Sequence, residues 1–572
     1  MQRYRGFQPE TRHYADRGEE TYQTHAKGSY IETRYFPIGT TASAALGNMN
    51  LGTPPNASLI EPKPTTTDVS TTLFSLFSRL TYGYDRKYLA YLSFRADASS
   101  LFAPNNRWGY FPSATAAWRI SQENFMQNYP WVNDLKLRFS YGSAGNNRIN
   151  PYLYSPQFNT NTQYGLLDQL VTGFAPASFS NPNLKWETTI SRNIGLDATL
   201  FNNRLGLTVD AYSNRTKNLL VNTPIPSSAG YSTQLQNVGS TTNKGVEVQV
   251  TGTILQNRKL TWTGSFNISF NQNKITSLGL QKSYLQNSGW AGSGNPADYI
   301  VQVGQPVGSM YGLVTDGFYK TSDFDYNPAT RVYTLKAGQP NDASITASTP
   351  MPGSLKYKGI GKDSVITAAD RQIIGNAQPK FFGGLMQQVS YHGFDLSVFI
   401  NFQYGNKVYN YNKLEFSSGY TPGASLMGFM KDRWHTVDGN GNVLEQLNSA
   451  GQVVGASPDS LNALNKGAKY WIPLVGSSST SFTPQSWAVE DASFIRINNI
   501  TLGYTLPVSL VRKMKLTRIR VYGTVNNVAV ITGYSGYDPE VNTRRDTPVT
   551  PGVDYSAYPR SRSFIAGLNV TF

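Results

Sequence analysis

The stretch that decides the fold is the last ten residues of the chain, Ser563-Phe564-Ile565-Ala566-Gly567-Leu568-Asn569-Val570-Thr571-Phe572. Alternate residues of a β-strand share a face, and one face here is apolar up to the terminal aromatic residue, with Phe564, Ala566, Leu568, Val570 and Phe572. This pattern predicts the closing strand of a membrane β-barrel, in which one face meets lipid and the other meets the lumen. It equally fits the last strand of a soluble β-sandwich, so the ten residues alone leave both folds open.

The composition favours a large β protein. The chain has 572 residues, of which 39% are hydrophobic and 13% aromatic, and its mean hydropathy is −0.38. No run of about 18 apolar residues occurs, so the sequence predicts no transmembrane helix. A membrane barrel tolerates this low hydropathy because only alternate residues of its strands need to be apolar.

Charge and cysteine content exclude several functions. The chain has no cysteine, which excludes disulfide bonds, thiolate zinc sites and cysteine nucleophiles. Its formal net charge is +15, yet it contains no compact basic run or nucleic-acid-binding motif, so we expect no nucleic-acid partner. The basic side chains are expected to line a lumen or loops, or to contact anionic lipid or polysaccharide.

From residue 71 onward, apolar and polar residues alternate in segments of about ten residues, the length that a tilted membrane strand needs. The clearest segments are Tyr88–Arg95, Leu135–Tyr141, Leu205–Ala211, Val246–Thr251, Trp262–Phe270, Phe394–Ile400 and Ile519–Val525. Residues 1–70 are polar and irregular, and the prolines of Thr53–Asn56 and Glu61–Pro64 exclude a central strand there. We expect a long loop in this region, with one short strand near Tyr30–Phe36.

The connections between these segments are of two kinds. Short turns are expected at Tyr84–Arg86, Phe201–Arg204, Gln256–Arg258, Tyr391–Gly393 and Pro507–Met514, and long loops over residues 145–183, 217–236, 276–303, 411–488 and 533–561. Short turns on one rim and long loops on the other are typical of a membrane barrel. The short turns lie on one rim only if an even number of strands crosses the sheet between residues 303 and 381. We therefore expect one strand near Gly308–Lys320 and a second at Arg331–Lys336 or Leu355–Ile360. This counting gives roughly 15 strands, against about 22 in the largest outer-membrane transporters.

Several stretches resemble the SusC/RagA family of TonB-linked outer-membrane proteins. They are Asn106–Ser113 with Ala117–Ile120, Leu137–Gly142 with Gly145 and Asn146, Asn181–Glu187, Val489–Tyr504, Tyr534–Glu540 and Tyr558–Arg560. The resemblance covers residues 71–572 and implies an all-β fold, an antiparallel transmembrane β-barrel of the TonB-dependent receptor type. The family's early strands and plug have no counterpart in this sequence. We therefore expect an incomplete barrel, roughly the last 15 of about 22 strands, with no plug domain.

The resemblance also implies a function and a location. It predicts TonB-dependent nutrient uptake, by import of a glycan or peptide substrate, in the cell outer membrane of a Bacteroidota-type bacterium, and no enzymatic activity. The implied partners are a SusD-like surface lipoprotein as a lid, the TonB complex through the missing N-terminal region, outer-membrane lipid and the barrel-assembly machinery. That machinery would read the terminal strand, with Phe564, Leu568, Val570 and Phe572 as the barrel-assembly signal.

The chain departs from the family pattern at its start. Met1–Phe7 lacks the apolar stretch of a signal peptide, and an open arc of strands has edges that lipid cannot satisfy. We therefore expect the C-terminal part of a transporter, not active alone, with residues 1–70 as an extracellular loop or remnant strand region and residues 71–572 as barrel. The alternative is a non-transporting surface β protein, either an adhesin or a glycan-binding module. A β-propeller enzyme would need repeats of about 40–50 residues, which the sequence lacks.

The sequence offers few candidates for chemistry, and we expect no catalytic, cofactor or metal site. Pro352–Lys358 precedes a stretch that resembles the family's EF-hand-like loop, but only Asp363 and Asp370 remain as carboxylates, too few for calcium. The four histidines lack ligand spacing, and Gly292–Ala297 matches G-x-G-x-x-A without the preceding strand of a dinucleotide fold. Six aromatic residues of the long loops are candidates either for stacking on sugar rings or for an interfacial girdle, namely Trp290, Tyr299, Trp434, Tyr470, Trp471 and Trp487.

Overall fold

The computed structural model describes residues 11–54, 64–166, 168–231, 233–290, 296–361, 363–420, 425–475, 482–543 and 548–572. Within these residues β-strands dominate, which confirms the all-β prediction. The α-helices are short: α1 (Ala42–Gly47), α2 (Ala343–Thr346), α3 (Tyr411–Ser418), α4 (Pro458–Leu464) and α5 (Val508–Lys513). None of the helices in the described residues has the length and apolar character needed to cross a membrane.

The main sheet contains 14 strands, close to the roughly 15 predicted. Its hydrogen-bonding order is β1-β2-β3-β4-β5-β8-β9-β10-β11-β20-β21-β28-β29-β31, so each strand neighbours the next strand of the sheet along the chain. The strands are β1 (Thr11–Tyr30), β2 (Thr65–Tyr84), β3 (Tyr88–Ser99), β4 (Trp108–Arg119), β5 (Val132–Asn146), β8 (Glu187–Leu200), β9 (Leu205–Pro224), β10 (Thr233–Gln256), β11 (Leu260–Leu278), β20 (Phe381–Tyr391), β21 (Phe394–Tyr404), β28 (Phe494–Thr505), β29 (Arg518–Thr532) and β31 (Ser563–Thr571).

The first strand is where the sequence-based prediction was wrong. Instead of a short strand near Tyr30–Phe36, β1 covers 20 residues and pairs with β2 along its whole length, from Thr11 opposite Tyr84 to Tyr30 opposite Thr65. The alternation of β1 is obscured because both of its faces are mostly polar. The functional division of the chain at residue 70 stays a prediction.

Two of the predicted long loops contain strands. Strands β9 and β10 extend into residues 217–236, where only residues 225–232 separate them. The segment 145–183 contains a hairpin of its own, β6 (Gln157–Leu166) with β7 (Gln169–Ser178). Strands β9 and β10 therefore continue beyond the apolar segments that predicted them.

The short connections have the backbone geometry of tight turns. Strands β20 and β21 are joined by His392 and Gly393, both with positive φ (49° and 88°), between the paired residues Tyr391 and Phe394. Two consecutive residues with positive φ are what a type I′ hairpin turn requires, and this turn matches the twist of the strands. The turn after β2 likewise contains Asp85 and Arg86 at φ 49° and 54°.

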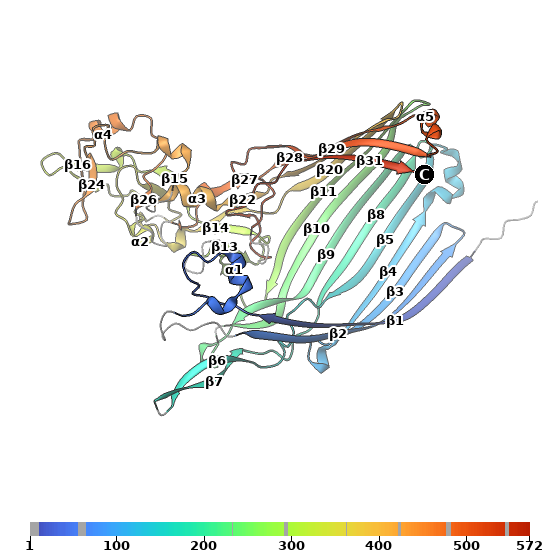
Figure 1. Ribbon diagram of the computed structural model, residues 1–572, viewed down its shortest axis with the longest axis horizontal. Helices are drawn as coiled ribbons and strands as arrows, with labels where there is room; N and C mark the ends of the chain where they lie inside the picture. The colour runs from blue at the N-terminus through green and yellow to red at the C-terminus, as the bar shows by residue number, and fades with distance from the viewer. Residues whose placement is uncertain are drawn as a thin grey trace, which may run out of the picture. The chain divides into compact units, whose positions relative to one another are not determined.

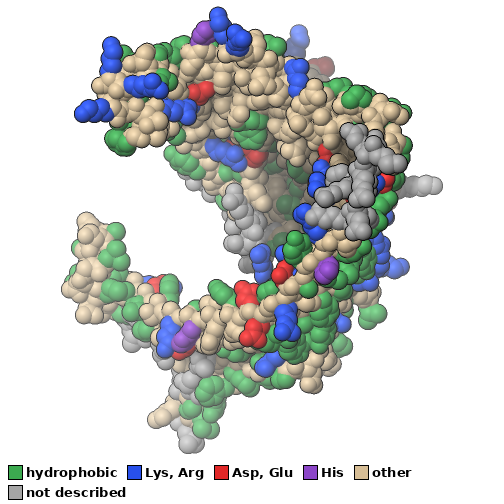
Figure 2. Space-filling view, turned by 90° about the vertical axis from the view of Figure 1, so that its right-hand side faces the viewer, with side chains coloured by type: hydrophobic (Ala, Val, Ile, Leu, Met, Phe, Trp, Pro, Cys, Tyr) green, Lys and Arg blue, Asp and Glu red, His purple; other side chains and the backbone are tan. Residues whose placement is uncertain are grey.

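One face of the sheet presents large apolar side chains without protein cover. On the C-terminal strands two neighbouring rows include Leu396 opposite Leu502 and Val521 opposite Leu568, with exposed fractions from 37% for Leu396 to 62% for Leu568. Figure 2 shows hydrophobic side chains over much of the surface that this view presents. Apolar side chains at alternate positions of every strand are what a lipid-facing surface requires.

The chain divides into two compact units. One comprises residues 1–117, 140–191 and 216–239, and the other residues 118–139, 192–215 and 240–572. The first has a small core of Phe102, Phe111, Leu184 and Trp186, at the loop ends of its strands. In the second, the inserted segments gather at one end of strands β11, β20 and β28, while α5 lies at their other end (Figure 1).

The strands predicted between residues 303 and 381 exist but do not cross the sheet, so their assignment as barrel strands was wrong. β14 (Ser309–Gly312), β15 (Val314–Phe318), β17 (Val332–Leu335) and β18 (Leu355–Lys358) belong to small separate sheets. β11 pairs directly with β20, from Leu260 opposite Tyr391 to Ser269 opposite Phe382. The short turns still lie on one rim, because zero is also an even number of crossing strands. All of 279–380 is therefore a single insertion.

The insertions fold into small sheets whose strands come from distant parts of the sequence. One sheet joins β12 (Ser283–Gln286), β13 (Tyr299–Gln302), β14 and β19 (Gln372–Asn376). A second joins β16 (Phe324–Asn327), β17, β25 (Val453–Gly455) and β24 (Glu445–Leu447), and a third joins β27 (Val489–Asp491), β22 (Lys407–Asn410) and β30 (Val553–Asp554). Two-stranded sheets are formed by β15 with β18 and by β23 (Gly419–Tyr420) with β26 (Leu474–Val475).

Candidate functional site

The face of the sheet opposite the apolar residues carries ion pairs that cross between strands. Arg138 on β5 donates to both oxygens of Asp197 on β8, at 2.8 and 2.9 Å, and to Asp210 on β9 at 3.2 Å. Arg520 on β29 makes the same two-pronged contact with Asp395 on β21, at 2.9 and 2.5 Å. Such bidentate pairs fix the geometry of both partners, so this face is polar, charge-balanced and rigid.

Two of the motifs quoted above meet in the first unit. The Trp186 indole N–H donates to the Arg107 carbonyl at 2.7 Å, and the Asn106 side-chain amide donates to the Pro182 carbonyl at 3.0 Å. The Phe111 ring lies edge-on to Trp186 with ring centres 5.4 Å apart. Gly145 leaves room for this ring, because a Cβ at residue 145 would lie 2.1 Å from it. The motifs thus lock the loop ends of neighbouring strands together.

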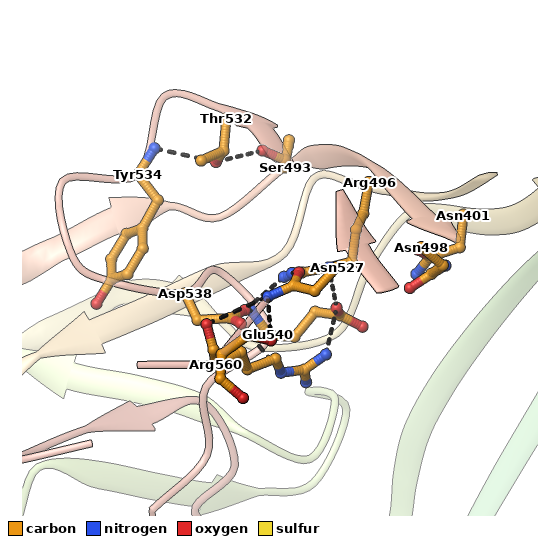
Figure 3. A network of polar contacts seen from close by, with 11 residues as sticks. Asn401, Ser493, Arg496, Asn498, Asn527, Thr532, Tyr534, Asp538, Glu540 and Arg560 are labelled. Atoms are coloured by element: carbon orange, nitrogen blue, oxygen red, sulfur yellow. Dashed lines mark hydrogen bonds and ion pairs between the residues drawn. The ribbon is translucent and has the colours of Figure 1, made fainter. Parts of the chain in front are cut away.

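The motifs near the C-terminus also hold strand and loop together, in a network of ion pairs that we call the C-terminal clamp (Figure 3). The buried Arg496 of β28 contacts Asp538 and Glu540, each at 2.7 Å, and donates to the Asn527 side chain at 2.7 Å. Arg560 approaches the same two carboxylates from the other side, at 3.0 and 3.1 Å. Four charges therefore hold the loop between β29 and β31 against the end of β28.

The inserted segments of the second unit have an aromatic core. Tyr411 lies between Trp290 and Tyr409, with ring centres 4.4 and 4.1 Å away in nearly parallel stacks. The Asp298 carboxylate accepts hydrogen bonds from the Tyr411 hydroxyl and from the Ser288 backbone and side chain. Burial raises the pKa of Asp298. Segments near residues 290, 300 and 410 are therefore held as one folded body and not as independent loops.

A second core, farther along the insertions, contains two buried carboxyl groups. Glu445 on β24 accepts a hydrogen bond from the Trp434 indole at 3.2 Å, and burial raises the pKa of Glu445 to about 8. Asp342, next to α2, is also buried, which raises its pKa to about 7. The cluster around Trp434 includes Tyr319, Phe324 and Tyr333. Glu445 is thus mostly protonated at neutral pH, and Asp342 changes its charge near neutral pH.

The six loop aromatics do not form one surface. Four of them, Trp290, Tyr299, Trp434 and Trp471, are buried core residues, so neither stacking on a substrate nor a girdle describes their role. Tyr470 and Trp487 are half-buried and meet with ring centres 5.6 Å apart. Phe429 packs on Tyr470 at 4.9 Å, and the Lys413 ammonium lies 3.8 Å above the Trp487 ring. This cluster, Phe429, Tyr470 and Trp487 with Lys413, is the candidate contact surface of the insertions.

The loop that resembles an EF-hand is closed by hydrogen bonds. The Asp370 carboxylate accepts from the Ile360 and Thr367 backbone N–H groups at 2.9 and 2.8 Å, and these bonds lower its pKa. Asp363 is exposed, and the described part of the chain contains no group of three or more acidic or histidine side chains that could hold a metal ion. Asp370 therefore acts as a structural cap of the loop. Most of Gly292–Ala297, through residue 295, lies outside the described residues.

The terminal strand lies at one edge of the sheet. Among the described strands, β31 pairs with β29 alone, with Leu568 opposite Val521 and Phe564 opposite Val525. Phe564, Leu568, Val570 and Phe572 are all exposed, and the terminal Phe572 carbonyl accepts a hydrogen bond from the Thr517 hydroxyl at 2.9 Å. Their role as an assembly signal stays a prediction.

The sequence pointed to several of these residues only as motif positions. It did not show that Arg496, Asp538 and Arg560 form one network, since they are separated by loops of unpredictable path. It missed Asp298, Glu445 and Asp342, and only Asp298 offered a signal, because it lies between the apolar Ala297 and the aromatic Tyr299. It also missed Phe429 and Lys413.

Comparison with known proteins gives consistent relatives. The family described as "TonB dependent receptor-like, beta-barrel" matches residues 2–349. TonB-dependent receptor P3 of Formosa agariphila is 32% identical over 507 residues, which are 88% of this chain and 46% of that protein. TonB-dependent receptor SusC of Bacteroides thetaiotaomicron is 28% identical over 519 residues, or 88% of this chain and 44% of SusC. The chain therefore spans about half the length of the relatives it matches.

Solved structures agree in fold. The RagAB peptide importer in its "closed-closed" state matches with a TM-score of 0.70 and 25% identity, over 98% of this chain and 54% of that chain. The RagAB peptide transporter matches with a TM-score of 0.71 and 25% identity, over 98% and 53% of the two chains.

Proposed function

This chain belongs to the TonB-dependent receptor β-barrel family, and we propose that it is the C-terminal barrel portion of an outer-membrane importer of the SusC type, with a glycan or peptide as substrate. Members of this family are outer-membrane transporters. The observation that carries the proposal is the main sheet, whose apolar face is exposed and whose opposite face is lined by ion pairs. A soluble sheet of this size would bury its apolar face, whereas lipid covers it in a membrane barrel.

The ends of the strands give the orientation that we propose. The short turns and α5 lie at one end and the folded insertions at the other, and long loops are extracellular in outer-membrane barrels. The half-buried cluster of Phe429, Tyr470 and Trp487 would then face the cell exterior, where nutrients arrive. Aromatic rings suit either a sugar ring or a peptide, and the adjacent Lys413 ammonium is already paired with Glu490 at 3.3 Å, so the cluster does not favour one substrate class.

Partners follow from the same proposal. The insertions would meet a SusD-like surface lipoprotein, and energy would come from the TonB complex through a part of the importer outside these residues. The barrel-assembly machinery would read the terminal strand, through Phe564, Leu568, Val570 and Phe572. The chain spans about half the length of its relatives, so import itself is proposed for the whole importer.

Two adjacent residues of β21 provide the test. Val398 lies on the apolar face opposite Ile500, and Ser397 lies on the polar face opposite Thr501. In a membrane barrel, Val398→Arg is expected to cost about 2–4 kcal/mol and to reduce outer-membrane levels, while Ser397→Arg is tolerated. Membrane fractionation and heat-dependent gel mobility measure both. If the protein is a folded monomer without detergent, and both variants behave alike, the soluble adhesin or glycan-binding module becomes the better assignment.

A further inference from the structure

Four cationic side chains lie at matching positions on strands β8–β11. They are Arg192 on β8, Arg215 on β9, Lys244 on β10 and Lys274 on β11, and all four are exposed. Each lies in the half of its strand that is farther from the short turns at 201–204 and 257–259. All four belong to the same compact unit.

Contacts between the strands set their register. Gly195 lies against Asp210 across β8 and β9, Gly206 against Thr251 across β9 and β10, and Asn273 donates to Asn243 across β10 and β11 at 2.9 Å. Counting along antiparallel strands from these contacts places Arg192, Ser213, Lys244 and Gln272 in one row. The next row toward the insertions contains Ile190, Arg215, Thr242 and Lys274. Three strand spacings of about 4.8 Å put the four cations within about 14 Å along the rows.

These cations share a face with the apolar side chains. On β8, Arg192 is the first residue of this face beyond Ile194, and on β10 Lys244 is the first beyond Val246. On β11, Lys274 is the second beyond Phe270. Ile194, Val246 and Phe270 are all largely exposed. Strands β8, β10 and β11 therefore change from apolar to polar or cationic where the lipid-facing band would end, and on β9 the small residues Ala211 and Ser213 precede Arg215.

The same face carries no acidic residue in these two rows. The remaining residues of the rows are Ile190, Ser213, Thr242 and Gln272. The acidic residues of these strands, Glu187, Asp197, Asp210 and Glu247, are on the opposite face, where Asp197 and Asp210 contact Arg138. Within the described residues, Arg215, Lys244 and Lys274 form no ion pair with a carboxylate. The charges of these three side chains are thus available to a ligand, and Arg192 adds a fourth cation beside them.

We propose that Arg192, Arg215, Lys244 and Lys274 bind the phosphate groups of an anionic lipid in the outer leaflet of the membrane. This inference rests on the proposed barrel and its orientation. A membrane lipid fits because its acyl chains would lie on the apolar residues directly below, while its phosphates reach the cations. Arg contacts phosphate through two parallel N–H bonds and Lys through a compact charge. Clusters of basic residues at a membrane surface attract anionic lipid at about 1 kcal/mol per residue.

The experiment compares two variants with equal charge change. The patch variant carries Arg192→Gln, Arg215→Gln, Lys244→Gln and Lys274→Gln. The control variant carries Lys282→Gln, Lys358→Gln, Lys431→Gln and Lys466→Gln, four exposed cations of the insertions. The detergent-purified full chain is titrated with diphosphorylated lipid A, and bound lipid is counted by native mass spectrometry. Phosphatidylcholine serves as the lipid without net charge, and inorganic phosphate serves as competitor.

The proposal predicts weaker lipid A binding by the patch variant, by at least about tenfold, and unchanged binding by the control variant. Phosphatidylcholine is expected to bind both alike, and millimolar inorganic phosphate is expected not to displace lipid A. Equal lipid A binding by the two variants overturns the proposal, as does displacement by inorganic phosphate, which would identify a site for the free ion. If the unmodified chain folds without detergent, the barrel assignment fails as well. A chain that needs detergent but binds lipid A equally in both variants refutes this inference alone.

Discussion

The Arg496 guanidinium lies 2.7 Å from the Asp538 carboxylate, and the Arg496 side chain is only 2% exposed. One partner is on strand β28 and the other is in the loop that leads to the terminal strand. The pair therefore joins the sheet to its last long connection. Removing one partner of a buried pair leaves the other charge without compensation.

Arg496→Gln is accordingly expected to lower stability by about 3–5 kcal/mol and to release the loop. Trypsin should then cleave faster after Arg560 and Arg562. Lys407→Gln is the matched control, because the Lys407–Asp491 pair is exposed and contributes less than about 1 kcal/mol. Equal cleavage rates in the two variants would argue against the clamp.

The raised pKa of Glu445 predicts that the stability of the core around Trp434 depends on pH. Its pKa is raised from 4.5 to about 8, so the unfolded state binds fewer protons between these values and stability falls as pH rises through this range. Glu445→Gln keeps an acceptor for Trp434 and should flatten this fall, by about 1.4 kcal/mol per pH unit at most. Thermal melts followed by tryptophan fluorescence at pH 5–9 measure it. Adding Asp342→Asn to Glu445→Gln should remove the remaining decrease of stability with pH. If this double variant lost stability with pH as steeply as the wild type, the two buried carboxyl groups would not be its cause.

Asp370 is expected to stabilise its loop without calcium. Asp370→Ala removes two hydrogen bonds from backbone N–H groups and should cost about 1–3 kcal/mol. Asp363→Ala, at an exposed position, should cost less than about 0.5 kcal/mol. Melting curves with and without EGTA test the metal directly, and a loss of stability on chelation in the wild type would show that the loop binds calcium after all.

The loop aromatics are expected to separate into two groups. Trp290→Ala should destabilise the insertions by about 3–5 kcal/mol, because its ring is buried against Tyr411. Tyr470→Ala should leave the fold intact and reduce uptake by the whole importer. Uptake of labelled peptide and oligosaccharide pools, compared at equal surface abundance, distinguishes the effects. Unchanged uptake by Tyr470→Ala would remove the aromatic cluster from the proposed contact surface.

Deletion of Phe572 tests the terminal strand. The deletion should lower outer-membrane levels of the whole importer, since β31 must pair at its edge to complete the barrel. Deletion of an equally exposed loop residue, Tyr558, provides the control. Quantitative blotting of outer-membrane fractions gives the readout, and normal abundance without Phe572 would rule out an assembly signal at this position.

Sequence patterns predicted the crossing strands because alternation over about ten residues reports directly on a two-faced sheet. Phe394–Ile400 and Trp262–Phe270 are examples in which every second residue lies on the apolar face. β1 was missed since Thr11–Tyr30 has polar residues on both faces. Gly308–Lys320 was misassigned because the short strands of a folded insertion alternate in the same way. The ion-pair clamps were beyond sequence reasoning, because they depend on the path of long connections.

Strands β11 and β20 are hydrogen-bonded neighbours although residues 279–380 separate them. The ends of this insertion are thus fixed by the sheet, and its interior has no role in setting the register. The entropy of closing a loop grows only with the logarithm of its length, about 0.6 kcal/mol per doubling. Closing the loop therefore adds little to the cost of a longer or shorter insertion. The cost of changing this segment lies instead in its contacts with the rest of the chain, such as β17 with β25 and Trp290 with Tyr411.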